Sequence, residues 1–143
     1  MSIKKLFLDN QIGVLVALFD KSDNYHPAAL EFIKNFKGQF ISTTAVLTEV
    51  CYLLDFSVET QLNFLTWVRN GAVKLEPVLV EDLEKIITLT RKYADLPMDF
   101  ADSTLVAIAD RLNIQKIASI DSDFMIYRFK QKQIFINVFD VVK

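Results

Sequence analysis

Short strand-like segments alternate with longer helical segments along this chain of 143 residues. The expected strands are apolar runs at residues 4–9, 40–42, 73–75, 117–120 and 134–138. The expected helices, whose apolar residues recur at helical spacing, span residues 13–19, 27–36, 44–54, 58–70, 83–94 and 100–112. Alternation of this kind is typical of a parallel sheet with helices on both faces. We therefore predict an α/β fold with a central parallel sheet.

Several residues mark where these helices begin and end. Thr43 or Thr44 is a suitable N-cap for the helix that follows it, and Ser57 for the next one. Their hydroxyl groups can accept hydrogen bonds from the first backbone N–H groups of a helix, which otherwise have no partner. Gly71 and Asn113 are suitable helix stops, because both residue types tolerate the left-handed conformation.

The composition indicates a single folded domain over residues 1–143. Hydrophobic residues make up 52% of the chain and charged residues 24%, which argues against disorder. The apolar runs are too short for a membrane span, and the N-terminal one is too short for a signal peptide. Because Cys51 is the single cysteine, an internal disulfide is excluded and a cytoplasmic location is expected.

The residue types present exclude several classes of catalytic site. His26 is the only histidine, so a two-histidine ribonuclease mechanism and a multi-histidine zinc site are unavailable within one chain. The sequence has no Gly-x-Ser-x-Gly motif, no Walker-type phosphate loop and no dinucleotide-binding glycine motif. A net charge of −2 argues weakly against a general nucleic-acid binder, although basic residues gather at 4–5, 91–92 and 128–132.

Four acidic residues interrupt or end apolar segments of the chain. They are Asp9, Glu49, Asp102 and Asp121. Carboxylates are rarely buried unless they are paired or bind a metal, because removing the charge from water costs several kcal/mol. Four of them in so apolar a chain indicate a shared cation site.

The expected fold brings these four acids to one edge of the sheet. Asp9 and Asp121 each lie at the carboxyl end of an expected strand, and ligands of open α/β sheets bind beyond those ends. Glu49 and Asp102 fall in the early turns of helices that start at the same edge, and each shares a helix face with apolar residues. We therefore expect both side chains to point inward.

Purely structural roles compete with metal binding at these positions. Asp9 is a candidate cap for the following helix, and Asp121 and Asp123 are candidate turn residues. Asp99 and Asp102 have the spacing of a capping box, in which each side chain accepts a hydrogen bond from the other's backbone N–H. We assign capping to Asp99 and metal binding to Asp102, because only Asp102 lies on the apolar face.

A cluster of carboxylates favours hydrolysis with the help of a divalent metal ion. Carboxylate oxygens are hard ligands that suit Mg²⁺ or Mn²⁺. Ions held in this way activate water and stabilise the leaving oxygen of a phosphodiester, so no side-chain base is needed. Phosphatases and receiver domains also gather aspartates at strand ends. They are disfavoured because the Asp-x-Asp-x-Thr/Val motif is missing and Glu49 has no role in their chemistry.

Four sequence blocks that contain these acids stand in a characteristic order along the chain, at residues 6–9, 48–50, 98–102 and 119–124. Together they resemble the PIN domain family, and in particular the VapC-type toxins of toxin–antitoxin pairs. The resemblance covers nearly the whole chain. It implies a three-layer α/β/α fold around a central parallel sheet and an endoribonuclease activity that depends on Mg²⁺ or Mn²⁺.

The resemblance also implies roles for individual residues and for partners. The family's metal-binding acids correspond to the four acids named above, Ser119 takes the place of a supporting hydroxyl residue, and Asp99 or Asp123 would assist as outer ligands. An RNA substrate, a cognate antitoxin protein and a homodimer are implied as well. The loop at residues 9–13 is longer than is usual in the family. It keeps open the alternative of a catalytically inactive PIN-like binding or assembly module.

Overall fold

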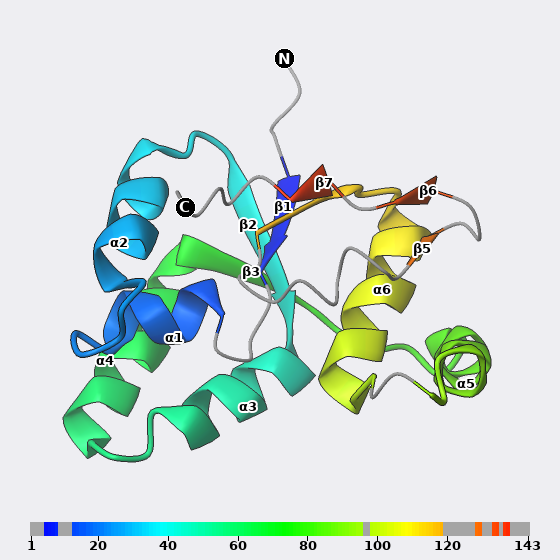
Figure 1. Ribbon diagram of the computed structural model, residues 1–143, viewed down its shortest axis with the longest axis horizontal. Helices are drawn as coiled ribbons and strands as arrows, with labels where there is room; N and C mark the ends of the chain where they lie inside the picture. The colour runs from blue at the N-terminus through cyan, green and yellow to red at the C-terminus, as the bar shows by residue number, and fades with distance from the viewer. Residues whose placement is uncertain are drawn as a thin grey trace.

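Five parallel strands form the central sheet of the computed structural model (Figure 1). The structure describes residues 5–8, 13–95, 98–118, 128–129, 133–134 and 136–137. In the order in which they lie side by side, the strands are β3 (Val73–Glu76), β2 (Gln39–Thr43), β1 (Lys5–Leu8), β4 (Lys116–Ala118) and β7 (Ile136–Asn137). Each neighbouring pair is parallel, so the carboxyl ends of the strands share one edge. The predicted parallel sheet is confirmed.

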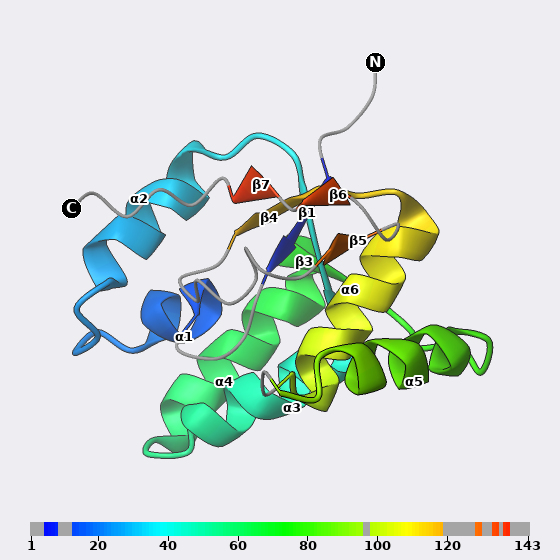
Figure 2. The ribbon, with the colours of Figure 1, turned by 45° about the vertical axis from the view of Figure 1, so that its right-hand side comes forward.

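Helices cover both faces of this sheet (Figure 2). In chain order they are α1 (Val14–Phe19), α2 (His26–Asn35), α3 (Thr44–Leu53), α4 (Val58–Trp67), α5 (Asp82–Lys92) and α6 (Phe100–Leu112). Helices α1 and α2 lie on one side of the sheet, and α6, with α5 outside it, lies on the other. Helix α3 starts where β2 ends. This is the expected three-layer α/β/α arrangement.

The helix boundaries follow the capping residues of the sequence. Thr43 and Ser57 each accept a hydrogen bond from the third backbone N–H of the helix that follows, at 3.3 Å and 3.2 Å. Asn113 adopts the left-handed conformation, with φ of 58°, and ends α6. Helix α4 continues into a π-helical turn (Val68–Ala72) in which Gly71 has a φ of 97°, a value that an L side chain rarely adopts. The predicted caps and stops are confirmed.

The end of the chain departs from the prediction of one strand at residues 134–138. Ile134 belongs to a separate antiparallel pair, formed by β5 (Arg128–Phe129) and β6 (Gln133–Ile134). In the central sheet the structure describes Ile136–Asn137, which pairs with β4. The prediction of a single strand was therefore wrong. An apolar run shows that a segment is extended but does not show which strand it pairs with: Ile134 pairs with Arg128, whereas Ile136 pairs with Lys116 of the central sheet.

A continuous cluster of buried apolar side chains lies between the sheet and the helices. The largest fully buried side chains are Leu15, Ile41, Leu54, Phe64 and Leu105. Within the ranges described, none of the helices is both long and apolar enough to cross a membrane.

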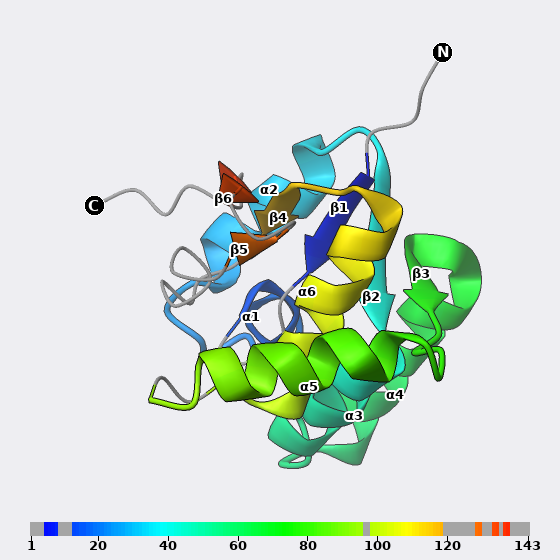
Figure 3. The ribbon, with the colours of Figure 1, turned by 90° about the vertical axis from the view of Figure 1, so that its right-hand side faces the viewer.

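Helix α5 packs across α6 (Figure 3), and the buried carboxylate of Asp82 joins the two. Asp82 is the first residue of α5, and its Oδ2 accepts a hydrogen bond from the backbone N–H of Leu79 at 2.8 Å. Its Oδ1 accepts a second bond from Nε of Arg111, on α6, at 3.0 Å. The same guanidinium also donates to the carbonyl oxygen of Pro77 at 3.1 Å. Asp82 thereby pairs with a backbone donor just before α5 and with the guanidinium of Arg111 on α6.

We expect Asp82→Ala to lower the free energy of unfolding by about 2–3 kcal/mol, because it leaves a backbone donor and part of a guanidinium without their acceptor. Urea unfolding checks this value. Asp110→Ala is the matched control: Asp110 pairs with Lys85 at 2.9 Å, but both side chains are partly exposed. A pair of this kind contributes about 0–1 kcal/mol. Equal losses in the two variants would contradict the prediction.

Candidate functional site

The carboxyl edge of the sheet is the place where the four predicted acids were expected to meet. Strands β1 and β4 end side by side there, with Leu8 opposite Ala118. Asp9 follows β1 directly in the sequence. The described residues include Glu49, Asp102 and the supporting candidate Asp99. The other candidates lie outside the described residues; they are Asp9, Asp121, Ser119 and Asp123.

Asp102 is a buried carboxylate in the first turn of α6, with 1% of its surface exposed. It forms a capping box with Asp99: the Asp102 N–H donates to Asp99 Oδ1 at 2.8 Å, and the Asp99 N–H donates to Asp102 Oδ2 at 3.4 Å. The capping role assigned to Asp99 is confirmed, and so is the inward orientation of Asp102. The box fixes the direction of the Asp102 carboxylate. It leaves capacity for a metal ion, because an ionised carboxylate has about four acceptor positions.

The start of α6 also lowers the electrostatic cost of burying Asp102. The N-terminus of a helix carries a partial positive charge, which favours a carboxylate in the first turn. The position of Asp102 in the first turn of α6 therefore suits the role of metal ligand that the sequence predicts for it.

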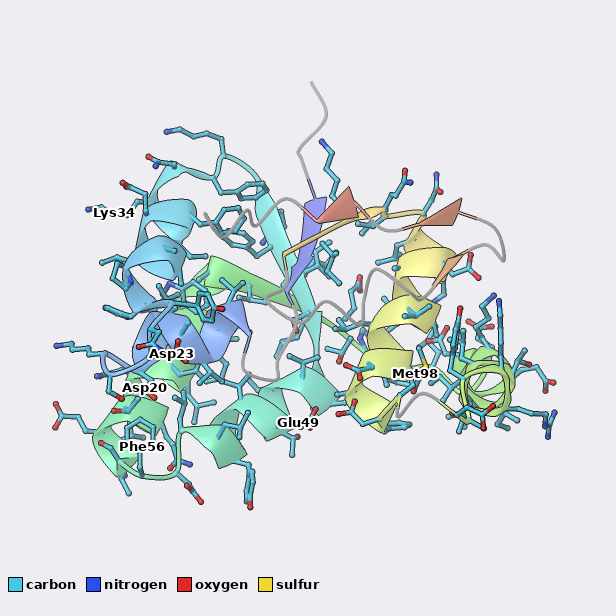
Figure 4. The ribbon with its side chains drawn as sticks, viewed as in Figure 1. Asp20, Asp23, Lys34, Glu49, Phe56 and Met98 are labelled. Atoms are coloured by element: carbon cyan, nitrogen blue, oxygen red, sulfur yellow. The ribbon has the colours of Figure 1, made fainter. Side chains whose placement is uncertain are left out.

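Glu49 lies on α3, near the start of α6, and is half-buried (Figure 4). Its neighbours Val46 and Val50 are fully buried, whereas Leu53, one turn further on, is exposed. Glu49 therefore stands at the margin of the buried face of α3. The expectation that it points inward holds less completely than for Asp102.

A chain of three hydrogen bonds joins the helices that carry Glu49 and Asp102. The Val46 N–H donates to Thr43 Oγ1 at 3.3 Å, and Thr43 Oγ1 lies 3.1 Å from Thr104 Oγ1. Thr104 donates its own proton to the carbonyl oxygen of Ala101 at 2.7 Å. Since a hydroxyl has one proton to donate, Thr43 is the donor in the bond between the two threonines. Both threonines are fully buried, so they hold the first turns of α3 and α6 together.

A cavity of about 440 Å³ opens between the first turns of α3 and α6. Its walls combine small apolar side chains, one aromatic ring and two carboxylates. The lining residues are Ala45, Thr48, Glu49, Asp99, Phe100 and Ala101. The cavity therefore borders one proposed metal ligand and the residues that position the other.

Among the described residues, no group of three or more histidine, cysteine or acidic side chains is placed to hold a metal ion. The described part of the site contributes two carboxylates, those of Glu49 and Asp102. Hard oxygen donors of this type fit Mg²⁺ or Mn²⁺ better than a soft metal. His26 has a different role, because its Nδ1 lies 2.7 Å from the carbonyl oxygen of Ala17 and joins α2 to α1.

Comparisons with known proteins agree with this architecture. The family model described as the PIN domain matches residues 13–130. The fold is similar to the crystal structure of VapC20 from Mycobacterium tuberculosis, a toxin that cleaves the sarcin–ricin loop, with a TM-score of 0.77. The two sequences are 21% identical, and the match covers 90% of this chain and 98% of that one, so the likeness concerns the fold. No curated protein sequence matches significantly.

Proposed function

Because the chain belongs to the PIN domain family, we propose that it is a metal-dependent endoribonuclease that hydrolyses phosphodiester bonds of RNA. The observation that carries the proposal is the buried carboxylate of Asp102, fixed by a capping box at the carboxyl edge of a parallel sheet. The capping box donates one hydrogen bond to the Asp102 carboxylate, and a bound cation would compensate its buried charge further. Asp102 is the expected ligand in a site that collects cations.

In this proposal Asp9, Glu49, Asp102 and Asp121 hold Mg²⁺ or Mn²⁺ within a single nuclease domain of residues 1–143. A divalent ion supplies activation of water and neutralisation of the charge that develops on the phosphodiester. The supporting positions are Ser119, Asp99 and Asp123, of which Asp99 acts by holding the Asp102 carboxylate in one orientation.

The protein's own residues contribute the rigidity of the site. The Thr43–Thr104 hydrogen bond keeps the start of α3 at a fixed separation from the start of α6. Glu49 and Asp102 are therefore presented by two helices that cannot move apart without breaking a buried hydrogen bond. Preorganisation of this kind removes the cost of gathering charged ligands at the moment of reaction.

The wider biological role follows by analogy with the structural relative. VapC20 is a toxin that cleaves the sarcin–ricin loop, and its fold is shared over 90% of this chain. We extend the proposal to the toxin of a type II toxin–antitoxin pair. Its partners are a cytoplasmic RNA, a cognate antitoxin protein and a second copy of the chain as a homodimer.

The proposal is tested by incubating purified protein with total RNA in Mg²⁺, in Mn²⁺ and in EDTA. We expect discrete cleavage products with either metal ion and none in EDTA, because in the proposed mechanism the ion activates the water and neutralises the developing charge. Metal binding is measured in parallel by the thermal unfolding midpoint. A midpoint raised by Mn²⁺ without cleavage of any RNA would favour the inactive PIN-like module. Equal cleavage in EDTA would reject the metal-dependent mechanism.

A further inference from the structure

Phe100 is an exposed aromatic residue at the point where α6 emerges from the core. It is the first residue of α6 and 56% of its surface is exposed, whereas residues 101–109 are all buried. Phe100 is one of the residues that line the cavity between α3 and α6, and it lies next to Asp99 and two positions before Asp102 in the sequence. Among the described residues, neither the capping box nor the buried core includes the ring of Phe100, so it is available to a ligand in the cavity.

The charges around the cavity restrict what that ligand can be. Glu49 and Asp99 contribute two carboxylates to the wall, and no lining residue in the described part of the chain is basic. In the proposed function Glu49 holds a metal ion, so the phosphate that is cut lies at that side of the cavity. The lining away from the two acids includes Ala45, Phe100 and Ala101 and offers no positive charge to a second phosphate. An uncharged planar group fits there and can lie against an aromatic ring. The volume of about 440 Å³ falls within the range typical of small-molecule pockets, roughly 300–1,000 Å³.

We propose that this cavity receives a nucleobase of the RNA substrate, beside the phosphate that is cut, and that the ring of Phe100 is its stacking surface. The inference rests on the proposed nuclease function. Bases stack on aromatic side chains in a way that tolerates any sequence, because every base has a π face. Phe100 thus holds the RNA strand by one base, while the carboxylates hold the metal ion beside the adjacent phosphodiester. Stacking of this kind changes affinity by roughly 5- to 100-fold when the ring is removed.

The first test compares the steady-state kinetics of Phe100→Ala with those of the wild type on an RNA oligonucleotide that contains a mapped cleavage site. We expect KM to rise roughly 5- to 100-fold with kcat nearly unchanged, since the ring contacts the bound base and not the reacting phosphate. Phe100→Trp keeps an aromatic face and is expected to retain a KM close to that of the wild type.

Phe56→Ala is the matched control. Phe56 is an equally exposed phenylalanine, at 59%, but it borders a different cavity together with Phe19 and Lys21. Figure 4 shows it at the far end of α3 from Glu49. The Phe56→Ala substitution is expected to leave KM unchanged. The thermal midpoint of each variant shows that any change in KM does not come from unfolding.

The second test assigns the contact to one base. Each nucleotide that flanks the cut is replaced in turn by an abasic ribonucleotide. At one position we expect the abasic substitution to raise the KM of the wild type as much as Phe100→Ala does, and to add nothing further in Phe100→Ala.

Three results overturn the inference, and they are distinguishable. Unchanged KM in Phe100→Ala removes the stacking role and leaves the nuclease function intact. If the rise in KM from Phe100→Ala and the rise from the abasic nucleotide add fully at every position, the stacking role is also removed, because ring and base then act independently. Failure of the wild type to cleave any RNA rejects the proposed function, and the base pocket with it.

Discussion

Asp102→Asn is expected to abolish RNA cleavage, with a fall in kcat/KM of at least about 10²-fold, while the protein stays folded. The substitution removes one negative charge from the site at nearly constant volume. An amide oxygen is a much weaker ligand for Mg²⁺ or Mn²⁺ than a carboxylate, so the affinity for the ion falls together with the rate.

The fold is expected to survive because the capping box does not need the charge. The backbone N–H of Asp102 still donates to Asp99 Oδ1, and the amide oxygen of the new side chain can accept from the Asp99 N–H. A neutral amide is also cheaper to bury than a carboxylate. The thermal midpoint without metal should therefore equal or exceed that of the wild type, and the increase caused by Mn²⁺ should shrink.

Asp110→Asn is the control for this prediction, since it makes the same substitution in the same helix. Asp110 lies near the other end of α6 and pairs with Lys85 at 2.9 Å. The Asp110→Asn protein is expected to cleave RNA at the wild-type rate. An Asp102→Asn protein that cleaves as fast as Asp110→Asn would refute the assignment of Asp102 to the metal site.

Phe64→Ala is expected to produce the largest loss of stability, about 3–5 kcal/mol. Phe64 is 1% exposed and is among the largest fully buried side chains. Its ring meets that of Phe19 edge to face, with 5.5 Å between centroids, and Phe19 meets Trp67 in the same way at 5.4 Å. Removing the ring leaves a cavity between α1 and α4 and breaks this aromatic chain, which contributes beyond the area it buries.

Urea unfolding measures the loss, and Phe56→Ala again provides the comparison. Phe56 is close in sequence but largely exposed, so its truncation should change the free energy of unfolding by less than about 0.5 kcal/mol. A loss below about 1 kcal/mol for Phe64→Ala would mean that the core collapses around the missing ring.

Local signals in the sequence predicted most of the fold. Thr43, Ser57 and Asn113 mark helix ends through bonds or conformations that involve only their near neighbours, and the structure places each as expected. The error at residues 134–138 has a different origin. Ile134 pairs with Arg128 and Ile136 with Lys116, and one apolar run contains no signal for the change of partner between these two residues.

In the candidate site, too, the sequence predicted a local feature and missed a contact between distant residues. The burial of Asp102 was predicted from the apolar face that the helical repeat indicates, and the structure buries residues 101–109 on all sides of α6. The bond between Thr43 and Thr104 was missed, because these residues are 61 positions apart and meet only once the sheet and α6 are packed. The available signal was weak: Thr104 is a polar residue in the segment 101–109 of α6, all of which is buried.

The strand order has a consequence for how two copies of the chain can associate. β3 is an outer strand of the central sheet, so one side of its backbone has no neighbouring strand among those described. It is only four residues long and carries Lys74, whose side chain is 60% exposed. Short outer strands with a lysine resist the addition of a further strand, because the charge would have to be desolvated. Self-association by continuing the sheet across β3 is therefore disfavoured, which protects the folded chain against fibril-like stacking at this edge and directs any homodimer contact elsewhere.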